Sequence, residues 1–339
     1  MAGNRQHIIP RFLQAGFASR KDQDDVFTWV YRVGQVPFEC NTLNVGVERE
    51  FYTIGADTAA DDAITDAEGP FNRLVNSLRE AQPQRVSQPQ IADLIAHFEI
   101  RTRHLRLAFS SATDYLLRAL AAFLADTHAA TEYFTRKART DPALLRKPLA
   151  DALGWPQDVV DWFVATAPPE IFNEAFAPWL PLLSDMIQNR LRGELPAIMK
   201  KSHIRALKST VSPVARADAL RNLAYATVAH PSGDLILGDS IVLFEVTGSR
   251  PYKKLLEGSD ELKAVYLPLS PRLVLVGATD PNWGVPSNLP DAIARCSFEY
   301  FISDRVTSTH ELRQARIGET AALLSNDELD DIVNSSLSD

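Results

Sequence analysis

The sequence predicts an α+β fold in which N- and C-terminal β segments share a sheet around a large central helical block. Residues 26–33 alternate, with Phe27, Trp29 and Tyr31 on one face, which is typical of a strand. Residues 91–98 instead carry apolar side chains at i, i+3, i+4 and i+7, the amphipathic helix pattern. From residue 231 the chain returns to short β-rich runs separated by Gly, Pro and Asp. This order of β, helical and β segments indicates an α+β arrangement.

The first two thirds follow that plan element by element. A second extended segment is expected over 43–54, where Val45 and Val47 share a face ahead of Glu48 and Glu50. Further along, prolines spaced about one helix apart mark the ends of helices rather than a linker. Aromatic residues appear in this block at helical spacing, and we expect them to pack in the core: Trp155, Trp162, Phe172, Phe176 and Trp179.

The last third is predicted to return to the sheet. Its β-rich runs are 235–237, 241–246, 265–267 and 273–276, and 287–301 shows a helical pattern. We therefore divide the chain into an N-terminal β element (1–64), a helical block (65–230), a C-terminal β/α part (231–326) and an acidic tail (327–339). Residues 1–326 are expected to form one integrated domain, and the tail is expected to be disordered.

Composition limits the class of protein. The 339 residues contain 43 acidic and 35 basic side chains, a net charge of -8, which argues against a surface coated with nucleic acid but leaves room for a local basic groove. The two cysteines, Cys40 and Cys296, are too few for a disulfide framework or a structural zinc site and suit a reducing compartment. No apolar run approaches the roughly 20 residues of a membrane span. A cytoplasmic protein without a membrane partner is expected.

Several catalytic signatures are missing from the sequence. It has no Gly-x-Gly-x-x-Gly, no phosphate loop, no His-Glu-x-x-His and no Gly-x-Ser-x-Gly. Nucleotide-dependent phosphoryl transfer and serine hydrolase chemistry are therefore disfavoured.

Separated short motifs point to one family. The chain opens with His7-x-x-Pro10-Arg11-x-Leu13, continues with Val45-Gly-Val-Glu-Arg-Glu-Phe-Tyr-Thr53, and places Glu68-Gly-Pro70 ahead of a helix that ends near Arg101-Thr-Arg103. Leu237-Gly-Asp-Ser-Ile-Val242 and Leu267-Pro-Leu-Ser-Pro271 follow in order. This series resembles the domain of unknown function 4238 family over roughly residues 5 to 302. The family carries no agreed activity, so the resemblance implies which residues matter but does not imply a reaction. The turn at Asp239 lacks the Asn-Pro of the family pattern, and Arg103-His104 lacks its proline.

The N-terminal block supplies the first candidate residues. His7 has a side chain that titrates near neutrality, so it is a candidate general base, with a turn-capping role as the alternative. Glu48 and Glu50 share a strand face by period-2 spacing and could hold Mg²⁺, or simply form a solvated edge. Glu68 is a candidate catalytic carboxylate, although acidic residues also favour helix N-termini.

A basic cluster and one aspartate complete the candidate site. Arg101, Arg103 and His104 stand near a helix end, where guanidinium groups can bind phosphate, or only complement the helix dipole. Arg11 is a further binding candidate in the opening motif. Asp239, in a turn between two β runs, is a candidate metal ligand or base, with turn chemistry as the alternative.

Together these residues predict an enzyme that acts on a phosphate-bearing substrate, a nucleic acid or a nucleotide. Phosphodiester hydrolysis in a toxin or phage-defence setting is the reaction they favour, with Mg²⁺ as the candidate cofactor. A non-catalytic binding or sensor module that recognises a protein or small ligand is the alternative, and a structural scaffold is the third. If the enzyme hypothesis holds, His7, a glutamate between Glu48 and Glu68, Arg101 or Arg103, and Asp239 should meet in one cleft.

Overall fold

The computed structural model describes residues 5–81, 83–87, 89–141, 143, 147, 150–151 and 154–338. These residues form two compact units, one of 5–109 with 199–323 and one of 110–198 with 324–338. The helical block expected over 65–230 is therefore divided, because its first and last helices belong to the β-containing unit. We describe each unit separately.

The first unit confirms the α+β prediction and the shared sheet. Strand β3 (Asp25–Arg32) pairs antiparallel with β13 (Tyr300–Ser303), and the Tyr31 and Phe301 rings stack with centroids 4.7 Å apart. The sheet order is β2-β3-β13-β8, with β4 also paired to β3. Its other strands are β2 (Arg20–Asp22), β4 (Phe38–Asn41) and β8 (Leu237–Gly238).

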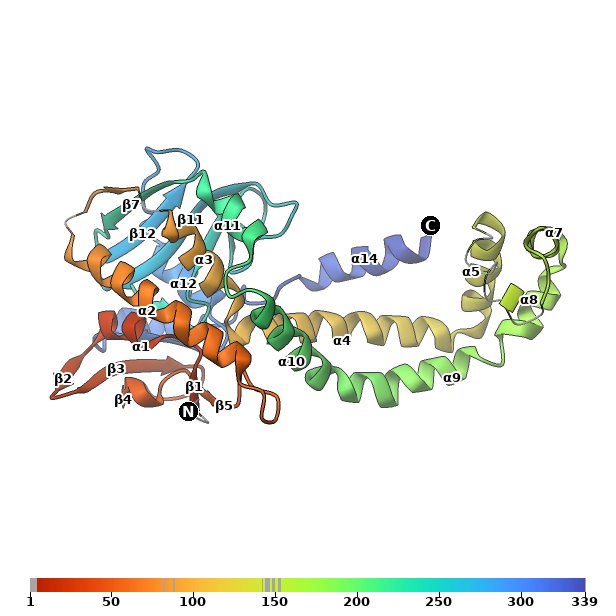
Figure 1. Cartoon of the computed structure of the whole chain (residues 1–339), viewed down its shortest axis with the longest axis horizontal. Coiled ribbons are helices and arrows are strands. Elements are labelled where there is room, and N and C mark those ends of the chain that lie inside the picture. Colours follow the sequence, from red (N-terminus) through yellow and green to blue (C-terminus); the bar gives the residue numbers. More distant parts are fainter. Residues whose placement is uncertain are drawn as a thin grey trace. The chain divides into compact units, whose positions relative to one another are not determined.

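A second, six-stranded antiparallel sheet carries most of the C-terminal β runs (Figure 1), in the order β10-β9-β11-β12-β7-β6. Its long central strands, β11 (Leu262–Ser270) and β12 (Leu273–Ala278), are apolar and buried, as expected for strands covered on both faces. The outer strands are β6 (Arg85–Val86), β7 (Ala224–Ala229), β9 (Leu243–Val246) and β10 (Tyr252–Lys253).

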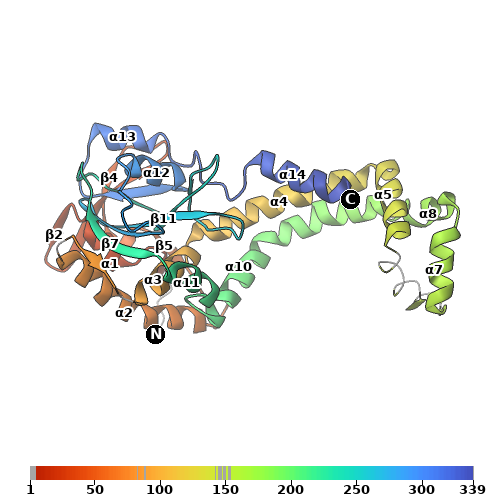
Figure 2. The same ribbon diagram turned by 90° about the horizontal axis from the view of Figure 1, so that it is seen from above.

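Helices join the two sheets into one core. Apolar side chains of α2 (Ala59–Glu80) and α3 (Gln90–Ile100) pack in one cluster with residues of both sheets. Helices α12 (Leu289–Cys296) and α13 (Ser308–Gln314) stand next to each other (Figure 2). The shorter helical elements of this unit are α1 (Arg11–Gln14), η1 (Ala15–Phe17), η2 (Thr42–Asn44) and α11 (Val214–Arg221).

The strand expected over 43–54 is much shorter than predicted. Only β5 (Val47–Arg49) forms, and it pairs with β1 (Arg5–His7) in a separate two-stranded ribbon. Glu50 ends the strand because its backbone is left-handed, with φ of 53°. Glu48 and Glu50 therefore do not share a strand face, which removes the geometric basis for a metal pair there.

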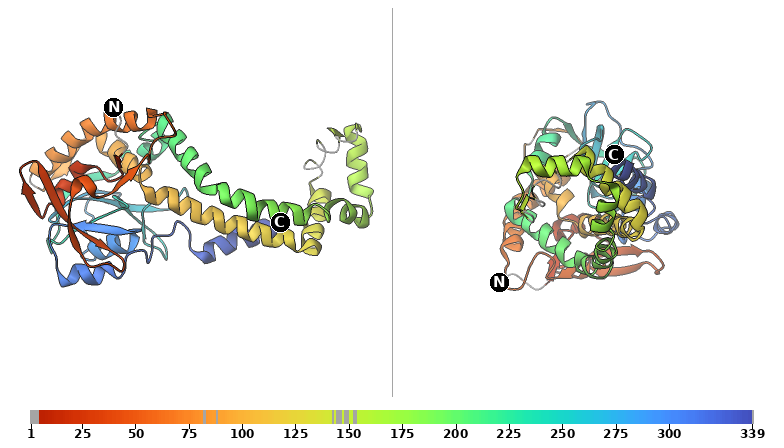
Figure 3. Two further views of the ribbon diagram at one scale, coloured as in Figure 1. Left: turned by 90° about the horizontal axis from the view of Figure 1, so that it is seen from below. Right: turned by 90° about the vertical axis from the view of Figure 1, so that its right-hand side faces the viewer.

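The second unit is helical. Within it, α4 (Arg103–Ala125) runs alongside the continuous helix of α9 (Leu180–Asp185), η3 (Met186–Leu191) and α10 (Arg192–Ser209), as Figure 3 shows; α4 and α10 also continue into the first unit. Ser184 donates a hydrogen bond to the Ala121 carbonyl at 2.8 Å, and Arg192 pairs with Asp114 at 2.6 Å. The remaining helices are α5 (Thr127–Thr140), α7 (Gln157–Thr166), α8 (Pro169–Phe176) and α14 (Asn326–Ser338).

Two expectations about this helical unit are wrong. Trp162 and Trp179 are 67% and 64% exposed, so only part of the aromatic set packs in a core. The acidic tail forms α14, because Ser325 and Glu328 make a reciprocal capping box: each side chain accepts a hydrogen bond from the backbone N–H of the other, at 2.6 and 3.2 Å. Leu329 then buries its side chain. Residue 339 lies outside the described residues.

One helix is longer and more apolar than the sequence led us to expect. Helix α4 has 23 residues and a window of mean hydropathy 1.2, so it is long and apolar enough to cross a membrane by length and composition alone. Core helices of soluble proteins meet the same length and hydropathy criteria but are mostly buried, whereas only 17% of this window is buried. The finding is weak evidence for a membrane partner, and location stays a prediction.

Three histidines of the first unit, His97 and His310 buried and His203 half-buried, share an arrangement that makes stability depend on pH. His97, His203 and His310 each accept a hydrogen bond from an arginine through Nδ1 or Nε2, at 3.2, 3.1 and 3.1 Å. Burial first, and then the arginine charge, lower their pKa values to about 3, 4 and 4. The folded state therefore binds their protons only well below pH 6.5, whereas the unfolded state binds them near it.

We expect each histidine to destabilise the fold by about 1.4 kcal/mol per pH unit as the pH falls from 6.5 toward 4. Buried Glu99, whose pKa burial raises to about 7, titrates in the opposite sense, so the comparison needs a variant. In urea titrations from pH 7.5 to 4.5, His203→Gln should lose stability less steeply than the parent chain. Parallel curves would contradict this account.

Candidate functional site

The strongest candidate site is a cavity of about 320 Å³ between β1, the start of α2 and the end of α3. We call it the His7 pocket. It brings together three residues predicted from the sequence, His7, Glu68 and Arg101. Its lining also includes Arg5, Gln6, Tyr52, Asp61 and Asp62.

Arg101 forms the back of this pocket and is only 1% exposed. Its Nη1 bonds Glu68 Oε1 at 2.6 Å, its Nη2 donates to the His7 carbonyl at 2.7 Å, and Tyr52 Oη donates to the Arg101 carbonyl at 2.9 Å. A buried charge is stable only when paired and hydrogen-bonded, and these contacts meet that need. Arg101 therefore fixes Glu68 and β1 relative to each other. Of its five N–H groups, one on Nη2 is not used by these contacts or by those to His97 and Tyr52.

His97 forms a hydrogen bond with Arg101 and was not among the residues predicted from the sequence. Its Nδ1–H donates to the Val211 carbonyl at 2.7 Å, which leaves Nε2 to accept from Arg101 Nη1 at 3.2 Å. The signal was present, since His97 and Arg101 are four residues apart on one helical face.

His7 is held in one tautomer. Its Nε2 lies 3.3 Å from the Thr42 carbonyl, which can only accept, so Nε2 carries the proton and Nδ1 keeps its lone pair. Burial lowers the pKa of His7, against the opposing effect of the Thr42 carbonyl. The ring is therefore neutral at pH 7 and has the form required of a general base.

The acidic residues of the His7 pocket differ in environment. Glu68 pairs with Arg101, whereas burial raises the pKa of Asp61 against the opposing effect of the nearby Gln6 amide. Asp62 lies at the exposed rim and accepts a hydrogen bond from Thr58 at 2.8 Å. Two carboxyl groups whose environments differ in this way are an arrangement used in acid–base chemistry.

Gln6 is the second residue that sequence reasoning missed. Its side chain is 4% exposed, and its Oε1 accepts a hydrogen bond from the Tyr52 backbone N–H at 2.6 Å. Its Nε2 is buried and makes no hydrogen bond of normal geometry within the described residues, although it lies near enough to the Asp61 carboxyl to lower that group's pKa. Because an unsatisfied buried amide costs about 1–3 kcal/mol, a ligand that accepts from it would recover that energy.

The remaining predicted residues mostly line a second, smaller cavity of about 70 Å³, the Arg103 pocket. There Arg103 is paired with Glu299 at 2.8 Å and with Glu48 at 3.4 Å. Two carboxylates thus hold Arg103, which leaves it poorly placed to bind phosphate. Glu48 is likewise engaged by an arginine, and no group of three or more His, Cys, Asp or Glu suited to a metal ion occurs among the described residues.

Asp239 lies in the Arg103 pocket and not beside His7, so the expected single cleft does not form. Its carboxylate accepts hydrogen bonds from the backbone N–H groups of Phe298 (2.7 Å), Glu299 (2.7 Å) and Tyr300 (3.3 Å). Burial raises the pKa of Asp239 to about 6 against these bonds. These contacts fix the start of β13, which fits the turn role given above as the alternative.

His104 also lines the Arg103 pocket, whereas two other candidates, Arg11 and Glu50, lie elsewhere. His104 is buried and its Nε2 donates to the Ala321 carbonyl at 2.8 Å, so it holds the chain end of this unit. Arg11 is exposed at the start of α1, and Glu50 is exposed at its left-handed turn. Neither Arg11 nor Glu50 lines the His7 or the Arg103 pocket.

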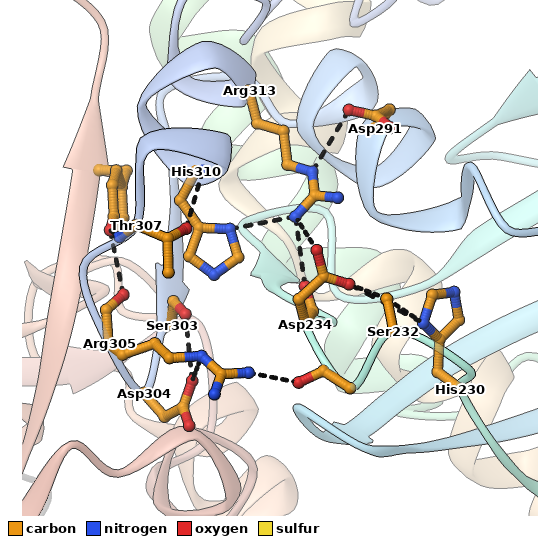
Figure 4. Close-up of polar contacts among 12 residues, drawn as sticks. His230, Ser232, Asp234, Asp291, Ser303, Asp304, Arg305, Thr307, His310 and Arg313 are labelled. Atoms are coloured by element: carbon orange, nitrogen blue, oxygen red, sulfur yellow. Dashed lines mark hydrogen bonds and ion pairs between the residues drawn. The ribbon is translucent and has the colours of Figure 1, made fainter.

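Another polar cluster, drawn in Figure 4, contains a serine, a histidine and an aspartate without forming a catalytic triad. Ser232 Oγ lies 2.8 Å from His230 Nδ1 and also contacts Asp234. A triad requires the acid to orient the histidine, but Asp234 instead binds Ser232 and Arg313, the latter at 2.7 Å. These contacts stabilise the turn at 231–234.

Comparison with known proteins identifies the family and adds no activity. The family model described as Protein of unknown function (DUF4238) matches residues 5–283, most of the chain, so the protein belongs to this family. No curated protein and no solved structure matches the chain. The predicted resemblance is thus confirmed, and the match includes every residue of the His7 pocket.

Proposed function

We propose that the His7 pocket is the active site of a hydrolase for a small phosphate-bearing substrate, such as a nucleotide. The observation that carries the proposal is the meeting of a histidine whose pKa burial lowers, an aspartate whose pKa burial raises, and buried hydrogen-bond donors in one cavity. Its volume of about 320 Å³ suits a small molecule. The net charge of -8 favours such a substrate over a long nucleic acid.

Phosphoryl oxygens would be bound by donors from two elements. Gln6 Nε2 and the unused Nη2 N–H of Arg101 are buried donors, and Arg5 adds a positive charge at the rim. Repulsion from Glu68 is limited, because its carboxylate is paired with Arg101 at 2.6 Å. Donors in a site of low water content stabilise developing negative charge more strongly than they would in water.

The reaction would proceed by acid–base catalysis. Water attacks phosphorus while His7 Nδ1 takes its proton, and the bond between phosphorus and the leaving oxygen breaks. Asp61 gives its proton to that leaving oxygen, which departs as an alcohol. The products are a phosphate with one ester bond fewer and the alcohol, and proton exchange with water restores both residues.

Asp61→Asn tests this assignment. The purified protein is assayed on nucleotides and on nitrophenyl phosphate mono- and diesters. We expect hydrolysis that the variant lowers about 10²- to 10⁴-fold, with loss of the alkaline limb of the pH–rate profile, because the general acid is gone. Glu50→Gln, an exposed site outside the pocket, is the matched control and should keep full activity. Equal activity in Asp61→Asn would contradict the proposed role.

A binding module that uses the same pocket is the second candidate, and the unpartnered Gln6 amide favours it equally. Calorimetry with a non-hydrolysed nucleotide analogue separates the two functions. Binding that Gln6→Leu weakens, without turnover of any substrate in the panel, would support the binding module over the enzyme.

A further inference from the structure

We propose that a second cavity in the first unit, which we call the arginine pocket, binds a small ligand that carries a phosphate or diphosphate group. Its volume is about 300 Å³. It lies between the segment around β10, one face of α12 and the chain after α13, and its main lining residues are Arg250, Tyr252, Asn288, Asp291, Arg295 and Arg316. Four of these six lie beyond residue 283, where the family match ends. The inference does not depend on the proposed hydrolysis.

Positive charge dominates this pocket. Three arginines from separate segments line it, against a single carboxylate, that of Asp291. Figure 4 shows that this carboxylate meets Arg313, whose Nε lies 3.3 Å from Asp291 Oδ1. The one acidic group on the wall is therefore already matched by a cation.

Glu319 is shared between two of the arginines. It lies 2.8 Å from Arg295 and 3.1 Å from Arg316, and the side chains of both arginines are about two-fifths exposed. One carboxylate cannot occupy the five N–H donors of each guanidinium, so both keep donors for an incoming anion. The guanidinium fork matches phosphate oxygens in a bidentate manner, which makes phosphate the best-fitting ligand group.

The arginine pocket also contains neutral polar groups, and one of its arginines is held in place by a main-chain carbonyl. Arg250 is tied down by its Nη2, which donates to the Ala322 carbonyl at 2.7 Å. Burial raises the pKa of Tyr252 to about 12, so its hydroxyl stays protonated, and Asn288 and Thr320 add further polar groups. Held donors lose little freedom on binding, which favours affinity.

A buried lysine, Lys254, lies two residues after Tyr252 of the arginine pocket. Lys254 is 8% exposed, and its Nζ has no hydrogen-bond partner within the described residues. The Cys296 thiol is influenced by Lys254, Arg250 and Arg295 together, and it lies 3.2 Å from Thr320 Oγ1 of the pocket. Lys254 and two of the pocket arginines therefore all act electrostatically on the same thiol.

Calorimetry with inorganic pyrophosphate as the probe tests this inference. We expect Arg295→Ala with Arg316→Ala to weaken its binding at least tenfold, and Glu319→Gln to strengthen it severalfold because a competing carboxylate is removed. Arg221→Ala, an exposed ion-paired arginine outside the pocket, is the control and should leave the affinity unchanged. Near-ultraviolet circular dichroism checks that each variant is folded.

The design separates this pocket from the His7 pocket. Gln6→Leu should remove only binding at the His7 pocket, so a component that survives in Gln6→Leu and disappears in the double arginine variant belongs to the arginine pocket. Replacing pyrophosphate with a nucleoside diphosphate shows whether the ligand contributes more than its phosphates. The proposal is overturned if pyrophosphate fails to bind Gln6→Leu at millimolar concentrations. It is also overturned if the double arginine variant binds pyrophosphate with the affinity of the parent chain.

Discussion

Arg101→Met should lower the free energy of unfolding by about 3–5 kcal/mol, the cost of breaking a buried ion pair from one side. The substitution leaves Glu68 without its cation, and it removes the donors to the His7 carbonyl and to His97 Nε2. Methionine fills much of the space but supplies no hydrogen bond. Urea unfolding monitored by tryptophan fluorescence, with comparison of midpoints at equal slope, measures the loss.

Arg103→Met is the matched control for this experiment. Arg103 stands two residues further along and is also ion-paired, with two glutamates, but its side chain is 43% exposed. Exposed ion pairs contribute about 0–1 kcal/mol, so we expect a loss within that range. Equal destabilisation by the two substitutions would show that Arg101 is not the centre of the buried network.

His7→Gln should lower the turnover number by about 10²- to 10⁴-fold, the usual contribution of a general base. The side-chain amide of glutamine can still donate to the Thr42 carbonyl, but it cannot take a proton from water. We expect the stability to change by less than about 1 kcal/mol, since a net hydrogen bond contributes only about that much. Measuring both quantities on one preparation separates a catalytic role from a structural one.

The pH dependence gives a second readout for His7. Because burial lowers its pKa, the base form persists below pH 6.5, and activity should fall only at a lower pH where the ring binds a proton. The acidic limb of the profile should be lost in His7→Gln. An acidic limb that is unchanged in this variant would assign the titration to another group.

The fold was predictable because its signals are local. Residues 26–33 alternate with period 2, the runs after residue 231 are continuous apolar segments bounded by Gly, Pro and Asp, and β3 and β13 do pair. The end of β5 at Glu50 was not predictable in this way, since a left-handed non-glycine residue leaves no pattern in the sequence. The capping box of Ser325 and Glu328 was readable, but the acidic composition around it favoured a disordered tail.

The candidate site was only partly predictable. His7, Glu68 and Arg101 were identified from the motifs and do meet in one pocket. Asp239 could not be assigned to its role, because its partners are backbone N–H groups about sixty residues away, which carry no residue signature. The open amide of Gln6 depends on burial, which a polar residue in a strand does not reveal.

Chemical rescue of His7→Ala tests the central claim most directly, because it asks whether an imidazole at this position performs the chemistry. The substitution removes the ring beside a cavity of about 320 Å³, which leaves room for free imidazole to enter. The measurement is the turnover number for the best phosphate ester as imidazole concentration rises, with Glu50→Gln as the control. We expect turnover to be lost in His7→Ala and restored by imidazole in a saturable way, with no response in the control. Full activity of His7→Ala without imidazole would contradict the account.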